Sequence, residues 1–273
     1  MVHHCSSRGL DRSFTVKALE AGHQVAATAR KPEQLADLVA QYGDQILPLQ
    51  LDVTDYEAAQ RAIAATVEKF GRVDVVVNNA GYANTASVKD MPMEMFRSQF
   101  ETVFFGVVNV TKAVLPIMRQ QQSEHIIQIS SLGGRIAGPG LTAYQSAKWA
   151  VGGFSEGVAQ EVAHFGIKVI ILEPGGMRTD WAGSSMKIPE ISEPYRPTVG
   201  ALAELMHNAS GSEPTDPNKV AELLLKLVEL SNPPVRLLVG TDAVQYAEAA
   251  ENARRESDIQ WRELSTSVGF DEA

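Results

Sequence analysis

The sequence has very little cysteine and no long apolar run. One of its 273 residues is a cysteine, Cys5, so no disulfide can form within the chain, as is usual in a reducing compartment. The polar start, from Met1 to Arg8, lacks the apolar core of a signal peptide. No later stretch has the roughly 18 consecutive apolar residues of a membrane-spanning helix. We therefore expect a cytoplasmic protein without a membrane span.

Basic residues are also few. The chain has 24 Lys+Arg against 33 Asp+Glu and a net charge of −9 at pH 7. Such a surface repels phosphate backbones, and no cluster of basic residues offsets it, which argues against a nucleic-acid partner. A metal site is not indicated, because His3, His4 and Cys5 have no carboxylate or second cluster at ligand spacing.

Apolar residues are plentiful, at 44% of the chain, and they recur in a regular alternation. Runs rich in Val, Ile, Leu and Ala predict strands over 25–29, 46–51, 73–77, 126–129, 169–172 and 235–239. Helical patterns between them predict helices over 13–21, 33–42, 56–70, 93–121, 144–165 and 217–230. Strands that are apolar throughout indicate a parallel sheet buried on both faces. We predict an α/β fold, a Rossmann-type doubly wound parallel sheet with helices on both faces, in one domain over 1–273.

Two segments depart from this alternation. Residues 180–217 are rich in proline, with one short predicted helix over 198–208, and we interpret them as a substrate lid over the carboxyl edge of the sheet. The segment 241–273 is predicted to be a helical tail. Together with Tyr82, the lid residues Trp181, Met186, Ile188 and Ile191 are expected to line an apolar substrate pocket.

Four motifs follow one another in a diagnostic order. They are Asn78-Asn79-Ala80-Gly81, Ser130-Ser131, Tyr144-Gln145-Ser146-Ala147-Lys148 and Pro174-Gly175-Gly176-Met177-Arg178-Thr179. Together they resemble the short-chain dehydrogenase/reductase family, and the resemblance covers essentially the whole chain. The Asp52-Val53-Thr54 turn and the long lid make it most similar to the 17β-hydroxysteroid and retinol dehydrogenase-like branch.

The chemistry of carbonyl reduction requires such residues. Hydride transfer to a ketone leaves negative charge on the oxygen, which needs a proton donor and a hydrogen-bond partner. Tyr144 is the expected donor and Ser131 the expected partner. Lys148, four residues further along the helix, lies on the face of Tyr144 and can stabilise its phenolate. The resemblance implies that Lys148 also holds the hydroxyls of the nicotinamide ribose.

The resemblance also implies a set of residues that contact the cofactor. In addition to Tyr144 and Lys148, these are Arg8, Gly9, Leu10, Arg30, Asp52, Val53, Asn79, Ala80, Gly81, Lys112, Pro174, Gly175, Met177 and Thr179. Asp52 and Val53 correspond to adenine contacts, and Thr179 is expected to reach the carboxamide or a phosphate. Lys112 matches a position that often supports the Asn-Asn-Ala-Gly turn, the alternative being a solvated lysine on the helix surface.

Charge predicts which cofactor is used. An acidic residue at the end of the second strand would accept the ribose 2′-hydroxyl of NAD(H) and repel a 2′-phosphate. This chain has Arg30 and Lys31 there, with Arg8 in the turn nearby, so NADP(H) is favoured over NAD(H). The alternative is that Arg30 is an ordinary surface residue at the end of a strand.

Three features depart from the family pattern. The phosphate-binding turn Thr-Gly-x-x-x-Gly-x-Gly keeps its middle glycine, Gly9, whereas Cys5 and Asp11 replace the other two. A carboxylate at Asp11 is expected to repel the pyrophosphate. Val103 stands where the family has an asparagine that holds a water, so the proton relay is expected to be incomplete. The first strand is shortened to 1–3, as if the chain began inside it.

The leading function is therefore an NADP(H)-dependent oxidoreductase that interconverts a carbonyl and a secondary alcohol. Its substrate is expected to be a hydrophobic small molecule, such as a lipid, a steroid-like compound or a secondary-metabolite intermediate. The damaged turn and Val103 leave two alternatives, a non-catalytic dinucleotide-binding or regulatory protein and a non-redox acid/base enzyme. The resemblance implies a homodimer or homotetramer that pairs through the helices over 93–121 and 144–165.

Overall fold

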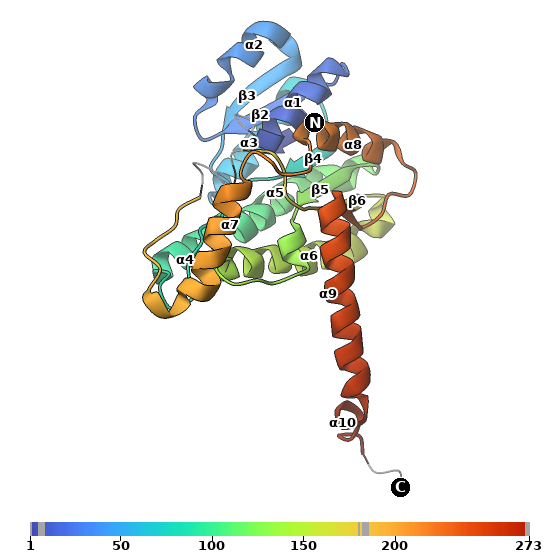
Figure 1. Cartoon of the computed structure of the whole chain (residues 1–273). Helices are drawn as coiled ribbons and strands as arrows, with labels where there is room; N and C mark the ends of the chain where they lie inside the picture. Colours follow the sequence, from blue (N-terminus) through green and yellow to red (C-terminus); the bar gives the residue numbers. More distant parts are fainter. Residues whose placement is uncertain (1, 5–8, 180, 182–185, 271–273) are drawn as a thin grey trace.

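A single parallel sheet forms the centre of the computed structural model, which describes residues 2–4, 9–179, 181 and 186–270 (Figure 1). In these residues seven strands pair in the order β3-β2-β1-β4-β5-β6-β7, all parallel. They are β1 Val2–His4, β2 Val25–Ala29, β3 Ile46–Gln50, β4 Val75–Asn78, β5 His125–Ile129, β6 Lys168–Pro174 and β7 Arg236–Val239. This order is the doubly wound Rossmann arrangement, so the predicted fold class is confirmed.

Helices cover both faces of the sheet. One face carries α3 Tyr56–Phe70, α4 Met93–Phe100, α5 Gly106–Gln121 and α6 Thr142–Val162. The other carries α1 Gly9–Glu20, α2 Ala36–Tyr42 and α8 Pro217–Glu229. The remaining elements are α7 Ala201–Ala209, α9 Thr241–Gln260, α10 Arg262–Thr266 and the short turns η1 Pro32–Leu35, η2 Gly43–Gln45, η3 Glu101–Phe105, η4 Leu132–Gly134, η5 Ala163–Phe165, η6 Glu193–Tyr195 and η7 Arg196–Gly200.

The strands are apolar throughout because successive residues enter two different cores. In β4, Val76 packs with α3 and α5, while Val75 and Val77 pack with α1 and α8. Ile126 and Ile127 in β5 divide in the same way. A side chain exposed on either face would leave one core unfilled, which explains the continuous valine and isoleucine runs.

Several elements differ from the sequence prediction. The predicted helix over 93–121 contains a π-helical turn, η3, between α4 and α5. The first helix begins at Gly9 rather than at residue 13. The strand predicted from residue 73 begins at Val75, because the side chain of Gln121 bonds both the N–H and the carbonyl of Val73. The helix predicted over 198–208 is a π-helical turn, η7, followed by α7.

The continuous helical run Met93–Gln121 is long and apolar enough to cross a membrane, by length and composition alone. It is the one such candidate among the described residues. In the structure α5 packs on α3, and α4 packs on α6.

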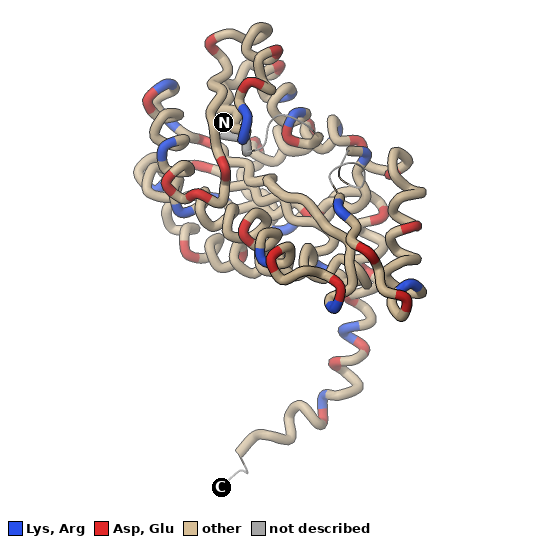
Figure 2. Tube along the Cα trace, turned by 90° about the vertical axis from the view of Figure 1, so that its left-hand side faces the viewer, with Lys and Arg blue, Asp and Glu red and all other residues tan. Residues whose placement is uncertain are grey.

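The C-terminal helices leave the body of the molecule. Helix α9 starts at the sheet and runs outward, with α10 at its far end (Figure 1). Charged residues of both signs follow the projecting part (Figure 2). Its first turns remain against the body, where Ala243 and Ala247 are fully buried.

Candidate active site

A cleft of about 1970 Å³ runs along the carboxyl edge of the sheet. The ends of the parallel strands meet there, so the residues that follow β2, β4, β5 and β6 all line it. Such an edge is the usual ligand site of an open α/β sheet. Of the predicted site residues that the structure describes, all but Lys112 lie in this lining.

Tyr144 and Ser131 meet inside this cleft. Tyr144 lies in the first turn of α6, and Ser131 precedes η4, whose Gly133 N–H donates to the serine hydroxyl at 3.0 Å. Tyr144 is 7% exposed. Burial raises its pKa to about 12, although the hydrogen bond with Ser131 lowers that pKa. The phenol is therefore protonated at neutral pH and able to donate a proton.

Lys148 approaches the same ring from one turn along α6. Its Nζ lies 5.8 Å from the centre of the Tyr144 ring and donates a hydrogen bond of 2.6 Å to the carbonyl of Ile129. Burial lowers the pKa of Lys148 to about 8, while the charge of Asp11 raises it. The predicted trio of Ser131, Tyr144 and Lys148 is thus brought together.

The Asn78-Asn79-Ala80-Gly81 turn is held by the side-chain amides of its two asparagines. Asn78 donates to Gln128 at 2.9 Å, and Asn79 donates to Asp11 at 2.6 Å. Lys112 is not part of this support. Its ammonium lies over the Tyr56 ring at 5.4 Å on the exposed side of α5, as the alternative interpretation of this residue had it.

Asp11, in the first turn of α1, lies in the wall of the cleft. Its side chain is 2% exposed, and its Oδ1 has no hydrogen-bond partner among the described residues. Burial raises its pKa to about 8, while the Asn79 hydrogen bond and the charge of Lys148 lower it. The remaining glycine of the turn, Gly9, has a φ of +58° and faces Thr179. Arg8 and Cys5 lie outside the described residues.

One end of the cleft is lined by charged and polar residues. Arg30 and Lys31 line one end together with Asp52, Val53 and Thr54, and both cations are exposed. Asp52 accepts hydrogen bonds from the N–H and the hydroxyl of Thr54, which fixes the turn after β3.

At the other end, Pro174 ends β6, and Gly175, Met177 and Thr179 follow it in the cleft wall. Asp242 of α9 supports this segment by accepting a 2.7 Å hydrogen bond from the Gly176 N–H. A Cβ at Gly175 would overlap the Asp242 carboxylate, so a larger residue there would displace this group. The sequence offered no signal for Asp242, because the contact spans 66 residues.

The predicted substrate pocket needs revision. Tyr82 and Trp181 line the cleft as expected, and the Trp181 ring lies 5.2 Å from the Tyr144 ring. Met186, Ile188 and Ile191 are not in the lining. The sulfur of Met186 contacts the Thr85 hydroxyl instead, and Ile188 faces solvent. The apolar lining includes Leu202, Leu205 and Met206 of α7 and Tyr246 of α9.

Val103 lies in the π-helical turn η3 and is fully buried. A Cβ placed on Gly81 would lie 3.6 Å from its Cγ2 and 3.8 Å from Nζ of Lys148. Val103 and Nζ of Lys148 thus both lie next to Gly81, and the methyl groups of Val103 cannot hydrogen-bond.

Comparison with known proteins identifies the family. A family model described as short chain dehydrogenase matches residues 5–188, more than half of the chain. The protein belongs to the short-chain dehydrogenase/reductase family. It is therefore an oxidoreductase of a family that binds nicotinamide dinucleotides.

Three relatives of this short-chain dehydrogenase/reductase illustrate the match. Oxidoreductase BOA17 of Botryotinia fuckeliana is 59% identical over 95% of both chains. A short-chain dehydrogenase structure from Streptomyces avermitilis is 36% identical, with a TM-score of 0.92 over 98% of this chain and 99% of that one. The closed form of a serine dehydrogenase complexed with NADP+ is 25% identical, with a TM-score of 0.75 over 88% and 94%.

The cleft fits such a dinucleotide apart from one group. Cations line one end and the Ser131, Tyr144 and Lys148 trio lines the other. Asp11 conflicts with a pyrophosphate when ionised, but a carboxyl group with a pKa of about 8 is largely neutral at pH 7.

Proposed function

We propose that this short-chain dehydrogenase/reductase interconverts a carbonyl and a secondary alcohol on a hydrophobic small molecule with NADP(H). The convergence of Ser131, Tyr144 and Lys148 in one cleft carries this proposal. A non-catalytic role would not require a buried phenol, a hydroxyl and an ammonium group to meet.

Each residue has a role in the proposed reaction. Ser131 donates a hydrogen bond to the substrate oxygen and orients the carbonyl. Tyr144 gives its phenolic proton to the same oxygen as negative charge develops there, and takes it back in the reverse direction. The charge of Lys148 stabilises the tyrosinate left behind, and its ammonium is placed to bind ribose hydroxyls. When bound, the nicotinamide supplies or accepts the hydride.

The preference for NADP(H) rests on charge. Arg30 and Lys31 line the cleft together with Asp52 and Val53, and in this proposal they bind the ribose 2′-phosphate. Asp52 is engaged by Thr54, so its carboxylate is already partly satisfied. The NADP+ complex of the related serine dehydrogenase supports this choice.

The apolar lining supports a lipophilic substrate. Leu202, Leu205 and Met206 line the same cleft as Tyr82 and Trp181. Burial of apolar substrate surface against these side chains would supply binding energy. We assign residues 180–217 as the substrate lid on this ground.

A turnover assay with NADPH and a panel of lipophilic ketones tests the proposal. Wild-type protein is expected to consume NADPH, and Tyr144→Phe to lose at least about 100-fold in kcat, because proton transfer contributes a factor of that size. Tyr195→Phe, whose ring lies outside the cleft lining, is the matched control and should keep full activity. NADPH binding without turnover of any ketone would favour the non-catalytic alternative.

A further inference from the structure

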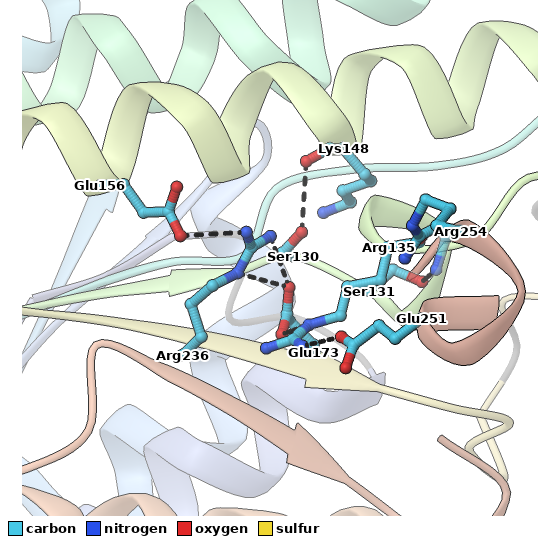
Figure 3. Close-up of polar contacts among 10 residues, drawn as sticks. Ser130, Ser131, Arg135, Lys148, Glu156, Glu173, Arg236, Glu251 and Arg254 are labelled. Atoms are coloured by element: carbon cyan, nitrogen blue, oxygen red, sulfur yellow. Dashed lines mark hydrogen bonds and ion pairs between the residues drawn. The ribbon is translucent and has the colours of Figure 1, made fainter. Parts of the chain in front are cut away.

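The C-terminal helix α9 is connected to the Ser131 turn through a chain of charged groups (Figure 3). Its centre is Glu173 in β6, which is fully buried. Glu173 accepts a hydrogen bond from Arg135 Nε at 2.6 Å and lies 2.7 Å from Nη2 of Arg236. Two arginines compensate a carboxylate that would be very costly to bury alone.

Arg135 is rigidly linked to Ser131. It ends the η4 turn, in which the Gly134 N–H donates to the Ser131 carbonyl at 2.8 Å and the Arg135 N–H donates to the Leu132 carbonyl at 2.8 Å. A displacement of Arg135 would therefore be transmitted to Ser131 through this single tight turn.

Helix α9 holds Arg135 at two points. Glu251 accepts a 2.5 Å hydrogen bond from Arg135 Nη1, and Arg254 Nη1 donates to the Arg135 backbone carbonyl at 3.0 Å. Arg254 is itself placed 5.7 Å from the Trp149 ring of α6. The guanidinium and the carbonyl of Arg135 are thus both fixed from outside the sheet.

The same helix supports the opposite wall of the cleft. Asp242, in its first turn, holds the Gly176 N–H, and Tyr246 contributes to the cleft lining. Gly176 follows Glu173 by three residues and lies just beyond the end of β6. One helix therefore fixes the Ser131 turn and the segment after β6 relative to each other.

We propose that Glu251 and Arg254 are positioning residues, which set the orientation of the Ser131 hydroxyl toward Tyr144 by holding Arg135. This proposal rests on the roles assigned to Ser131 and Tyr144 in the proposed function. Glu251 is half exposed and Arg135 is partly exposed, and exposed ion pairs contribute little to stability. The effect of the pair should therefore appear in catalysis more than in folding.

Glu251→Gln tests the proposal, with Glu248→Gln as the matched control. Glu248 is exposed one turn earlier on α9 and makes no ion pair within the described residues. Glu251→Gln is expected to lower kcat at least about tenfold, because small misplacements of a reacting group are costly. The dissociation constant of NADPH should change less than twofold. Glu251→Asp is expected to restore part of the lost kcat.

The pH profile separates positioning from a general structural effect. The Ser131 hydrogen bond lowers the pKa of Tyr144, so a loosened Ser131 should shift the rise of alcohol oxidation with pH to higher pH. Partial unfolding alone would lower the concentration of active enzyme without changing the pH at which the rate of alcohol oxidation rises.

Each outcome has one meaning. The proposal would be overturned if Glu251→Gln had the same kcat as the Glu248→Gln control and the same pH dependence of alcohol oxidation. If Tyr144→Phe retained full turnover, the proposed function itself would fail, and this result is independent of the α9 variants.

Discussion

Asp11 occupies the position at which the family has the third glycine of its phosphate-binding turn. The sequence predicts a fixed negative charge that repels the pyrophosphate. The structure places the carboxyl in the cleft wall, where burial raises its pKa to about 8. The group is then neutral below this pH and anionic above it, so its effect on an anionic cofactor depends on pH.

We predict that NADPH binding weakens as pH rises from 7 to 9. The protonated fraction of a group with a pKa of about 8 falls about tenfold over this interval, and the dissociation constant should rise by a similar factor. At pH 9, Asp11→Gly is expected to bind NADPH more tightly than the wild type does. Fluorescence titration of the reduced cofactor measures both effects.

Asp11→Asn is the control for this prediction, because Lys148 also has a pKa of about 8 and its loss of charge would weaken anion binding in the same direction. Asparagine keeps the size of the side chain but does not titrate. A flat profile in Asp11→Asn assigns the dependence to Asp11, whereas an unchanged slope would assign it to Lys148.

What the sequence could predict at this scale depends on separation along the chain. Tyr144 and Lys148 are four residues apart on one helix, so their common face follows from helix geometry. The contacts of Asp242 with Gly176 and of Glu251 with Arg135 span 66 and 116 residues. They depend on where α9 returns to the body, and no local pattern encodes that position.

At the scale of elements, the π-helical turn η3 is the feature that periodicity missed. Apolar residues recur over 93–121 with helical spacing, and this pattern does not show a local change from α- to π-type hydrogen bonding. The first residue after the turn, Gly106, lies against Val53, so that a Cβ there would be 2.6 Å from Val53 Cγ2. The sequence therefore predicts the position of this helix but not the contact of Gly106 with Val53 in the cleft lining.

Gly106→Ala should destabilise the protein by about 1–3 kcal/mol, since the added methyl overlaps a buried side chain. It should also weaken NADPH binding, because Val53 lines the cleft and must move. Urea unfolding and cofactor titration measure the two effects.

Gly157→Ala on α6 is the matched control, with nothing within 4 Å of the added Cβ. It should be neutral or stabilise by up to about 1 kcal/mol, because alanine is the better helix former. Equal free energies of unfolding for the two variants would show that Gly106 is not closely packed.

At the scale of the whole molecule, the outer surface of α4, η3, α5 and α6 carries large aromatic side chains. Phe105 and Trp149 are each 44% exposed. The Phe104 ring lies 5.1 Å from that of Phe105 and 6.1 Å from that of Phe154 in α6, so the aromatic cluster joins the two helical runs. Exposed aromatic residues at the centre of a helical face are typical of protein interfaces.

We predict that the chain forms a homodimer through this surface. Helices α5 and α6 contain 16 and 21 residues, lengths of about 24 and 32 Å. A face of that size can provide the roughly 800 Å² per partner of a stable interface. Light scattering after size exclusion should give the mass of two 29.6 kDa chains.

Phe105→Glu places a charge in this surface and should yield single chains, because an unpaired charge at the core of an interface is strongly unfavourable. Val244→Glu, on the exposed side of α9, is the control and should leave the mass unchanged. If Phe105→Glu kept the mass of the wild type while Val244→Glu halved it, the chains would associate through the exposed side of α9. In that case α9 would have two functions, support of the Ser131 turn within the chain and contact between chains. Dilution would separate the chains, and activity would fall because α9 would then hold the Ser131 turn less firmly.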